Sequence, residues 1–153
     1  MIVKLLFALG LTCVTVLIHA LGTWTAIVHM APMRSQRKGN QGLLATEIQI
    51  VSVVSVLLLL HLVEAGAWAV FYRLSGDFPD LETAIYFSMT SYTTVGYGDV
   101  LMPAPWRVLG PIEAAVGILM FGWSTAIIVA AITRTHGNRL QREAEADGGS
   151  SSP

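Results

Sequence analysis

The chain has 153 residues, of which 54% are hydrophobic and 12% are charged, and its formal net charge at pH 7 is -1. This composition is typical of a membrane protein, and a net charge so close to zero argues against a nucleic-acid partner. The one cysteine, Cys13, excludes a disulfide framework, and the four histidines lack the spacing of metal ligands.

The first element is an apolar stretch at residues 1–30, with Lys4 near its start. At about 1.5 Å per residue, a helix of this length crosses a hydrocarbon core of about 30 Å. We expect a retained transmembrane helix and not a signal peptide, because the apolar region is too long and no Ala-x-Ala cleavage site follows it. Small and polar residues recur on it at three- and four-residue steps: Thr12, Thr15, His19, Thr23 and Ala26. This stripe is predicted to pack against protein, with His19 as a hydrogen-bonded packing residue.

The next segment, residues 31–46, has a different composition. It holds a proline, two glycines and three cations, which predict an exposed cytoplasmic loop. Thr46 and Gln49 fit a capping box, in which the threonine caps the helix and the glutamine reaches back to it. We therefore expect the second transmembrane helix to begin here and to cover residues 47–72.

A surface turn and a short helix are predicted after the second transmembrane helix. Residues 73–80 contain a glycine and a proline, which favour a turn. Asp80 is placed to cap an amphipathic helix at residues 81–92, which is too short to span a membrane. The carbonyl end of such a helix carries a partial negative charge, which favours a nearby cation.

The residues after this short helix, 93–99, lie between two apolar segments, where non-helical backbone must line something polar. Successive carbonyls of an ordinary strand point to alternate sides. Glycine enters left-handed backbone regions at little cost, so Gly96 and Gly98 allow the carbonyls from Thr94 to Tyr97 to point the same way. The alternative is that Gly-Tyr-Gly-Asp forms only a turn.

A third transmembrane helix is predicted at residues 106–133, after a turn that contains Pro103 and Pro105. Pro111 is expected to kink this helix or to delay its regular start. Three arginines follow, and the acidic tail, residues 136–153, is rich in glycine and serine and is expected to be disordered. Since basic segments flank an even number of crossings, we expect the C-terminus in the cytoplasm and the N-terminus outside. The short loops suit a bacterial inner membrane.

Five of these residues, Thr94-Val95-Gly96-Tyr97-Gly98, resemble the selectivity filter of the potassium-channel pore-domain family, and the resemblance extends over roughly residues 47–135. It implies an all-α membrane protein with three transmembrane helices, a re-entrant pore helix at 81–92 and a filter loop. It also implies a homotetramer around a central pore, since one filter strand cannot encircle an ion. The extra first helix departs from the minimal two-helix channel and is a candidate contact for an unknown regulatory partner.

The resemblance also assigns roles to individual residues of the filter region. Potassium is the implied permeant ion, and no other cofactor is implied. The filter comprises Thr94, Val95, Gly96, Tyr97 and Gly98, and the ligands of the ion are the carbonyls of the first four residues and the threonine hydroxyl. Thr93 and Asp99 would support the filter, although a solvated loop position is the alternative for Asp99. Tyr97 favours potassium selectivity, because some non-selective relatives carry aspartate there. Thr90 is a departure, because some members of the family place an acid at that position.

Two glycines of the third transmembrane segment, Gly117 and Gly122, match the position of a gating hinge in the family's inner helix. The alternative is that these glycines allow close helix packing. A voltage sensor is not expected, because the first helix contains no arginine.

Two acids inside the predicted membrane helices, Glu64 and Glu113, fall at similar depths beside the pore helix. Acids in a membrane are costly and are usually buried against partners. One hypothesis is that at least one of them is protonated or hydrogen-bonded to pore-helix hydroxyls, such as those of Ser88, Thr90 or Ser91, and biases the filter's conducting state. The other is purely structural pairing, with Arg107 or His61.

Passive conduction of K⁺ is therefore the predicted function. A non-conducting or regulatory channel subunit is an alternative. The Gly-x-Gly-Asp pattern ending at Asp99 also fits an intramembrane aspartyl protease, which needs a second aspartate in the membrane. The remaining aspartates, Asp77, Asp80 and Asp147, fall in predicted loops or in the tail, so we do not expect an enzyme.

Overall fold

A computed structural model of the chain describes residues 2–36 and 43–149, and over these residues it contains four helices and no strand. They are α1 (Ile2–Gln36), α2 (Leu43–Leu74), α3 (Leu81–Tyr92) and α4 (Leu109–Gly149). Three of them contain apolar spans long enough to cross a membrane, at Ile2–Thr25, Glu47–Leu74 and Leu109–Thr133. The protein is an all-α integral membrane protein, as the sequence predicted.

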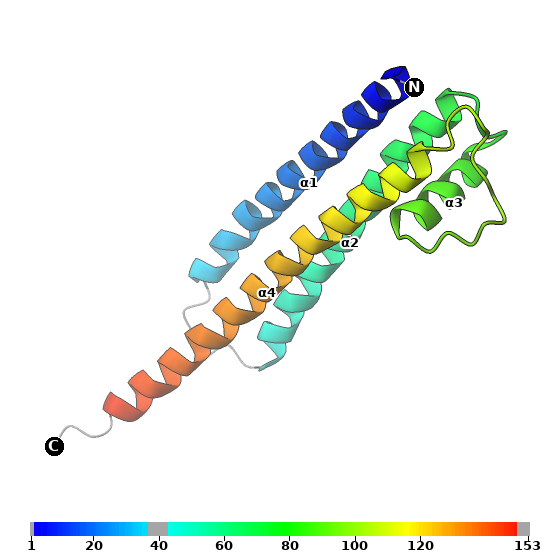
Figure 1. The fold of residues 1–153 in the computed structure, drawn as a ribbon. Coiled ribbons are helices and arrows are strands. Elements are labelled where there is room, and N and C mark those ends of the chain that lie inside the picture. Colours follow the sequence, from blue (N-terminus) through cyan, green and yellow to red (C-terminus); the bar gives the residue numbers. More distant parts are fainter. Residues whose placement is uncertain (1, 37–42, 150–153) are drawn as a thin grey trace.

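The three long helices lie side by side, and the short α3 packs at one end of them (Figure 1). α3 contacts α2 and α4, while α1 contacts the same two helices. α1 begins at the end of the molecule where α3 packs, and α4 ends at the opposite end. This placement agrees with a chain that crosses the membrane an odd number of times.

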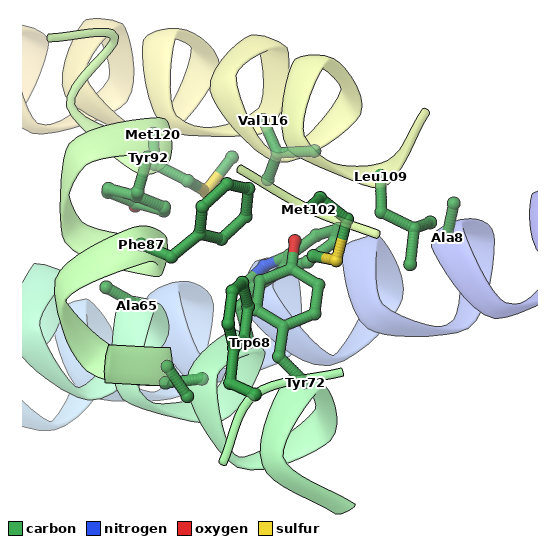
Figure 2. Packing of buried hydrophobic residues seen from close by; sticks show 13 residues of the cluster. Ala8, Ala65, Trp68, Tyr72, Phe87, Tyr92, Met102, Leu109, Val116 and Met120 are labelled. Carbon is green, nitrogen blue, oxygen red and sulfur yellow. The ribbon is translucent and has the colours of Figure 1, made fainter. Parts of the chain in front are cut away.

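The core lies where α3 meets α2 and α4 (Figure 2). α2 contributes Trp68 and Tyr72, α3 contributes Phe87, and α4 contributes Val116 and Met120. Most other large apolar side chains of the three spans are exposed on the single chain. Such surfaces are a liability in water, but they are the expected outer surface of helices in lipid.

The ends of the first two helices differ from the prediction. α1 continues to Gln36, past Pro32, and α2 begins at Leu43, so part of the predicted loop at 31–46 is helical. The capping box is wrong, because Thr46 lies inside α2. The residues before it, Leu-Leu-Ala, are strong helix formers and extend the helix toward the N-terminus. The central part of the loop, residues 37–42, with two of its three cations, lies outside the described residues.

The predicted disordered tail is also wrong over most of its length, because α4 runs to Gly149. Residues 140–146 are leucine, glutamine, arginine, glutamate and alanine, all good helix formers, so the helix propagates beyond the membrane span. Residues 150–153 lie outside the described part of the chain. At its other end α4 begins at Leu109 and not at residue 106, which places Pro111 in the first turn, where its missing N–H costs no helical hydrogen bond.

The short helix α3 has the predicted bounds, because its start is fixed by a local interaction. Asp80 Oδ1 accepts a hydrogen bond of 2.7 Å from the backbone N–H of Thr83, and Oδ2 accepts one of 2.9 Å from the Thr83 hydroxyl. These hydrogen bonds hold the pKa of Asp80 below its ordinary value. Asp80 is thus the N-cap that the sequence predicted.

Replacing Asp80 with alanine should lower the Tm of the purified protein by a few degrees, because two first-turn hydrogen bonds are lost. Asp80→Asn keeps an acceptor oxygen and should lie near the wild type. Since the pKa of Asp80 is lowered in the folded protein, the charged cap stabilises above its ordinary pKa of 3.8 and is lost as the pH falls through the lowered value. An Asp80→Ala protein with an unchanged Tm at pH 7 would show that the cap is dispensable.

Candidate functional site

The segment after α3 has an unusual backbone. The φ angle is positive at Thr94 (63°), Gly96 (51°) and Gly98 (80°), whereas the residues between them are not in the left-handed region. Every second residue is therefore left-handed, which is the alternation that aligned carbonyls require. Both glycines singled out in the sequence take part. Thr94 was missed as a left-handed position because a non-glycine residue rarely adopts it.

Three amide groups of this segment are turned toward α3. Thr93 N–H donates to the Met89 carbonyl at 3.1 Å, and Gly96 N–H donates to the Thr90 carbonyl at 3.0 Å. Thr94 N–H donates to the carbonyl of Ser91 at 2.9 Å. The last turn of α3 thereby accepts three of the segment's donors, and the segment's own carbonyls are left for another ligand.

Asp99 ties the far end of this segment back to α3. Its Oδ2 accepts a hydrogen bond of 2.7 Å from the Tyr86 hydroxyl. This hydrogen bond is the main cause that lowers the pKa of Asp99, although the carboxylate is exposed. The geometry is that of an anchor and not of a free loop aspartate.

Replacing Tyr86 with phenylalanine should raise the pKa of Asp99 back toward its ordinary value of 3.8, because the donor that favours the charged carboxylate is gone. A ¹³C NMR titration of the aspartate carboxyls of the purified protein would measure this shift. Thr83→Val is the matched control, since it removes a hydroxyl donor from Asp80 and should leave Asp99 unchanged. An unmoved Asp99 in Tyr86→Phe contradicts the anchor.

Two buried carboxylates flank α3, as the helical spacing predicted. Glu113 accepts hydrogen bonds from the Ser88 hydroxyl at 2.5 Å and from the Tyr72 hydroxyl at 2.7 Å. Ser88 was one of the predicted partners, and Tyr72 was not. The Thr90 hydroxyl instead donates to the Phe87 carbonyl of its own helix at 3.0 Å.

Glu64 has a different set of partners. Its Oε1 lies 2.8 Å from His19 Nδ1, and its Oε2 accepts a hydrogen bond from the Tyr92 hydroxyl. His61 Nδ1 lies 3.4 Å from Oε2, so the predicted pairing with His61 is present. Arg107, the other predicted partner, is exposed. His19 and Tyr92 were missed as partners because they are distant in sequence and belong to other helices.

The polar stripe of α1 faces protein, as predicted. Thr15, His19 and Thr23 are buried, and the Thr15 hydroxyl accepts a hydrogen bond of 2.9 Å from Trp68 Nε1 on α2. The side chain of Ala26 lies outside the described residues.

The side chains of His19, His61 and Glu64 are close enough to hold a metal ion, since their ligand atoms lie within 4.8 Å of one another. Their nitrogens and oxygens are, however, engaged in hydrogen bonds. Among the residues that the structure describes, no buried side-chain nitrogen or oxygen lacks a hydrogen-bond partner. The cluster is therefore complete as a hydrogen-bond network without an ion.

The two hinge candidates have different surroundings within the chain. A Cβ at Gly117 would overlap the carbonyl oxygen of Tyr92 and lie 3.0 Å from its carbonyl carbon, whereas a Cβ at Gly122 meets nothing within 4 Å. Gly117 thus allows close packing of α4 on the end of α3. α4 is continuous through both positions, and a hinge role for either stays a prediction.

Gly117→Ala should destabilise the protein by about 1–3 kcal/mol, because the new methyl group is forced against backbone atoms. Gly122→Ala should be neutral or stabilising by up to about 1 kcal/mol, since alanine favours a helix. Thermal unfolding of both variants would measure the difference. Equal Tm values would mean that α4 does not rest on Tyr92 as described.

A family model described as an ion channel matches residues 57–134, just over half of the chain. The chain belongs to this ion-channel family. The match supports a potassium-channel-like pore domain, covering the second half of α2, the pore helix, the segment at 93–99 and the membrane span of α4. α1 precedes the matched region of the channel. No curated protein and no solved structure matches the chain.

The family also bears on the enzyme alternative, because a channel needs no catalytic group. The aspartyl-protease mechanism needs a second aspartate near Asp99 in the membrane. The three membrane spans contain no aspartate, while Asp77 and Asp80 lie in the exposed turn between α2 and α3.

Proposed function

We propose that four copies of this chain form a K⁺-selective channel, whose filter is built from Thr94, Val95, Gly96, Tyr97 and Gly98. Potassium would bind the carbonyls of Thr94, Val95, Gly96 and Tyr97, with Thr93 and Asp99 holding the two ends of the filter. Conduction is passive, since carbonyl oxygens replace the water around the ion and several ions occupy the filter in file.

The observation that carries this proposal is the direction of the filter's polar groups. The left-handed residues alternate along the segment, and three of its amides donate to carbonyls of α3. Amides turned toward the helix imply carbonyls turned away from it. A backbone surface rich in acceptors, at the negative end of a helix, favours a cation.

The fourfold assembly follows from what one chain lacks. A single segment gives an ion carbonyls on one side only. Its side chains are also uncovered in one chain, where Val95 is 52% exposed and Tyr97 is 73% exposed. Neighbouring subunits around a fourfold axis would supply the missing carbonyls and cover these side chains.

The proposed topology places the N-terminus and the filter on the outer side and the end of α4 in the cytoplasm. The support is that the N-terminus lies at the filter end of the molecule, while three arginines follow the span of α4 at the other end (Figure 1). We expect the membrane to be a bacterial inner membrane.

The test is a flux assay with the purified full chain in liposomes, comparing a K⁺ gradient with a Na⁺ gradient. We expect K⁺ flux at least roughly tenfold above Na⁺ flux, with block by Ba²⁺. Gly96→Ala should abolish this preference, because an L side chain is strained at a φ of 51°.

Gly76→Ala is the matched control. Gly76 also has a positive φ, of 79°, but it lies in the turn before α3, so its strain should leave selectivity unchanged. Equal K⁺ and Na⁺ flux in the wild type would refute selectivity. A folded tetramer without flux would identify the chain as a non-conducting subunit.

A further inference from the structure

All four described helices meet in one buried polar cluster, which we name the Glu64 network: His19, His61, Glu64, Tyr92 and Ser124. Four of its members belong to regions that a channel of this family already has. His19 is different, because it comes from α1, which precedes the matched region. The network therefore connects the additional helix to the pore domain.

The hydrogen bonds of the network define one donor order. The Tyr92 hydroxyl donates its one proton to Glu64, so it accepts from His61 Nδ1, which lies 3.0 Å away. In a neutral His61 ring, Nε2 then accepts from the Ser124 hydroxyl at 2.9 Å. The Tyr92 hydroxyl is thus held on two sides, and His61 in turn is fixed by α4.

His19 completes the network from α1. Its Nδ1 binds the carboxylate oxygen that Tyr92 does not use, and therefore fixes the orientation of the carboxylate. A buried carboxylate that loses a partner in a low-dielectric interior is strongly destabilised. Without His19, Glu64 would have to reorient toward its remaining partners, and the hydrogen bond between its carboxylate and the Tyr92 hydroxyl would change.

Tyr92 stands at the base of the proposed filter. It is the last residue of α3, and two residues later the chain adopts the left-handed backbone of Thr94. A non-glycine residue in that conformation persists only where its surroundings hold it there. Two contacts hold Tyr92, close to this residue. Gly117 packs against the Tyr92 carbonyl, and the Glu64 network binds the Tyr92 hydroxyl.

We propose that His19, Glu64 and Tyr92 are positioning residues, which hold the base of the filter in its ion-selective geometry. Through His19, the ion selectivity of the pore then depends on α1. This proposal rests on the proposed function. The rival is that the network only satisfies buried polar groups and that the filter does not depend on it.

The experiment compares the K⁺/Na⁺ permeability ratio, from reversal potentials, of full-length variants that elute as wild-type-sized assemblies. Tyr92→Phe and His19→Leu remove one hydrogen bond each to the two oxygens of Glu64. We expect the ratio to fall roughly tenfold or more in each, since the filter relaxes. His19→Asn places an amide nitrogen near the position of Nδ1 and should restore the ratio to within about twofold of the wild type.

Two threonines provide matched controls for lost hydroxyl groups. The Thr12 hydroxyl lies on the same face of α1 as His19 but donates only to the Ala8 carbonyl of its own helix. Thr125 follows Ser124 and donates only to the Phe121 carbonyl. Thr12→Val and Thr125→Val should keep the wild-type ratio, whereas Ser124→Ala should lower it.

The outcomes separate the two proposals. A wild type that does not select K⁺ refutes the proposed function. The positioning role alone is overturned if the wild type is selective and both Tyr92→Phe and His19→Asn keep the wild-type ratio. In that case His19→Leu either keeps the same ratio or fails to assemble. One metal ion per chain in the purified wild type, measured by mass spectrometry and lost in His19→Asn, would also overturn it, because the cluster would then be a metal site.

Discussion

The structure depends on how a short stretch of non-helical backbone is satisfied inside a membrane protein. An unpaired amide in hydrocarbon costs several kcal/mol, so irregular backbone must find partners within the protein. Here the amides of Thr93, Thr94 and Gly96 are accepted by the last turn of α3, which has free carbonyls because its helix ends there. The helix terminus and the segment that follows it thus complete each other. Their arrangement determines which polar groups face away from the protein.

The position of α3 follows from two buried acids on either side of it. Glu113 binds Ser88 and Glu64 binds Tyr92, so each carboxylate is joined to the short helix by a hydroxyl group. Burial of an ionisable group is unfavourable unless hydrogen bonds compensate it, and here each acid has several. The pairs do little for overall stability compared with apolar packing. They do fix where the helix lies, because a displaced α3 would cost each acid one of its hydrogen-bond partners.

Local features of the sequence predicted the structure best. The bounds of α3 were predicted correctly because Asp80 caps the helix. The left-handed backbone at Gly96 and Gly98 was predicted correctly because glycine adopts a positive φ angle at little cost. Depth along a helix was enough to place Glu113 beside the hydroxyls of α3, although not to tell which of the three would bind it. Helix ends were less predictable, since propensity extended α2 and α4 beyond the polar residues that were expected to stop them. The contact between His19 and Glu64 joins residues 45 positions apart, and no spacing rule brings two helices together.

Thr94 has a consequence for how the complete pore behaves. A threonine in the left-handed region stores about 1–3 kcal/mol of strain, which a glycine would relieve, but glycine has no hydroxyl to offer an ion. Contacts within the chain already hold this strained shape, and the proposed fourfold ring would add contacts between subunits to them. In the proposed fourfold ring, each copy would also support the filter geometry of its neighbours. A cell that makes a mixture of normal and faulty subunits would then lose most of its channels, because a single faulty copy disturbs the ring that contains it.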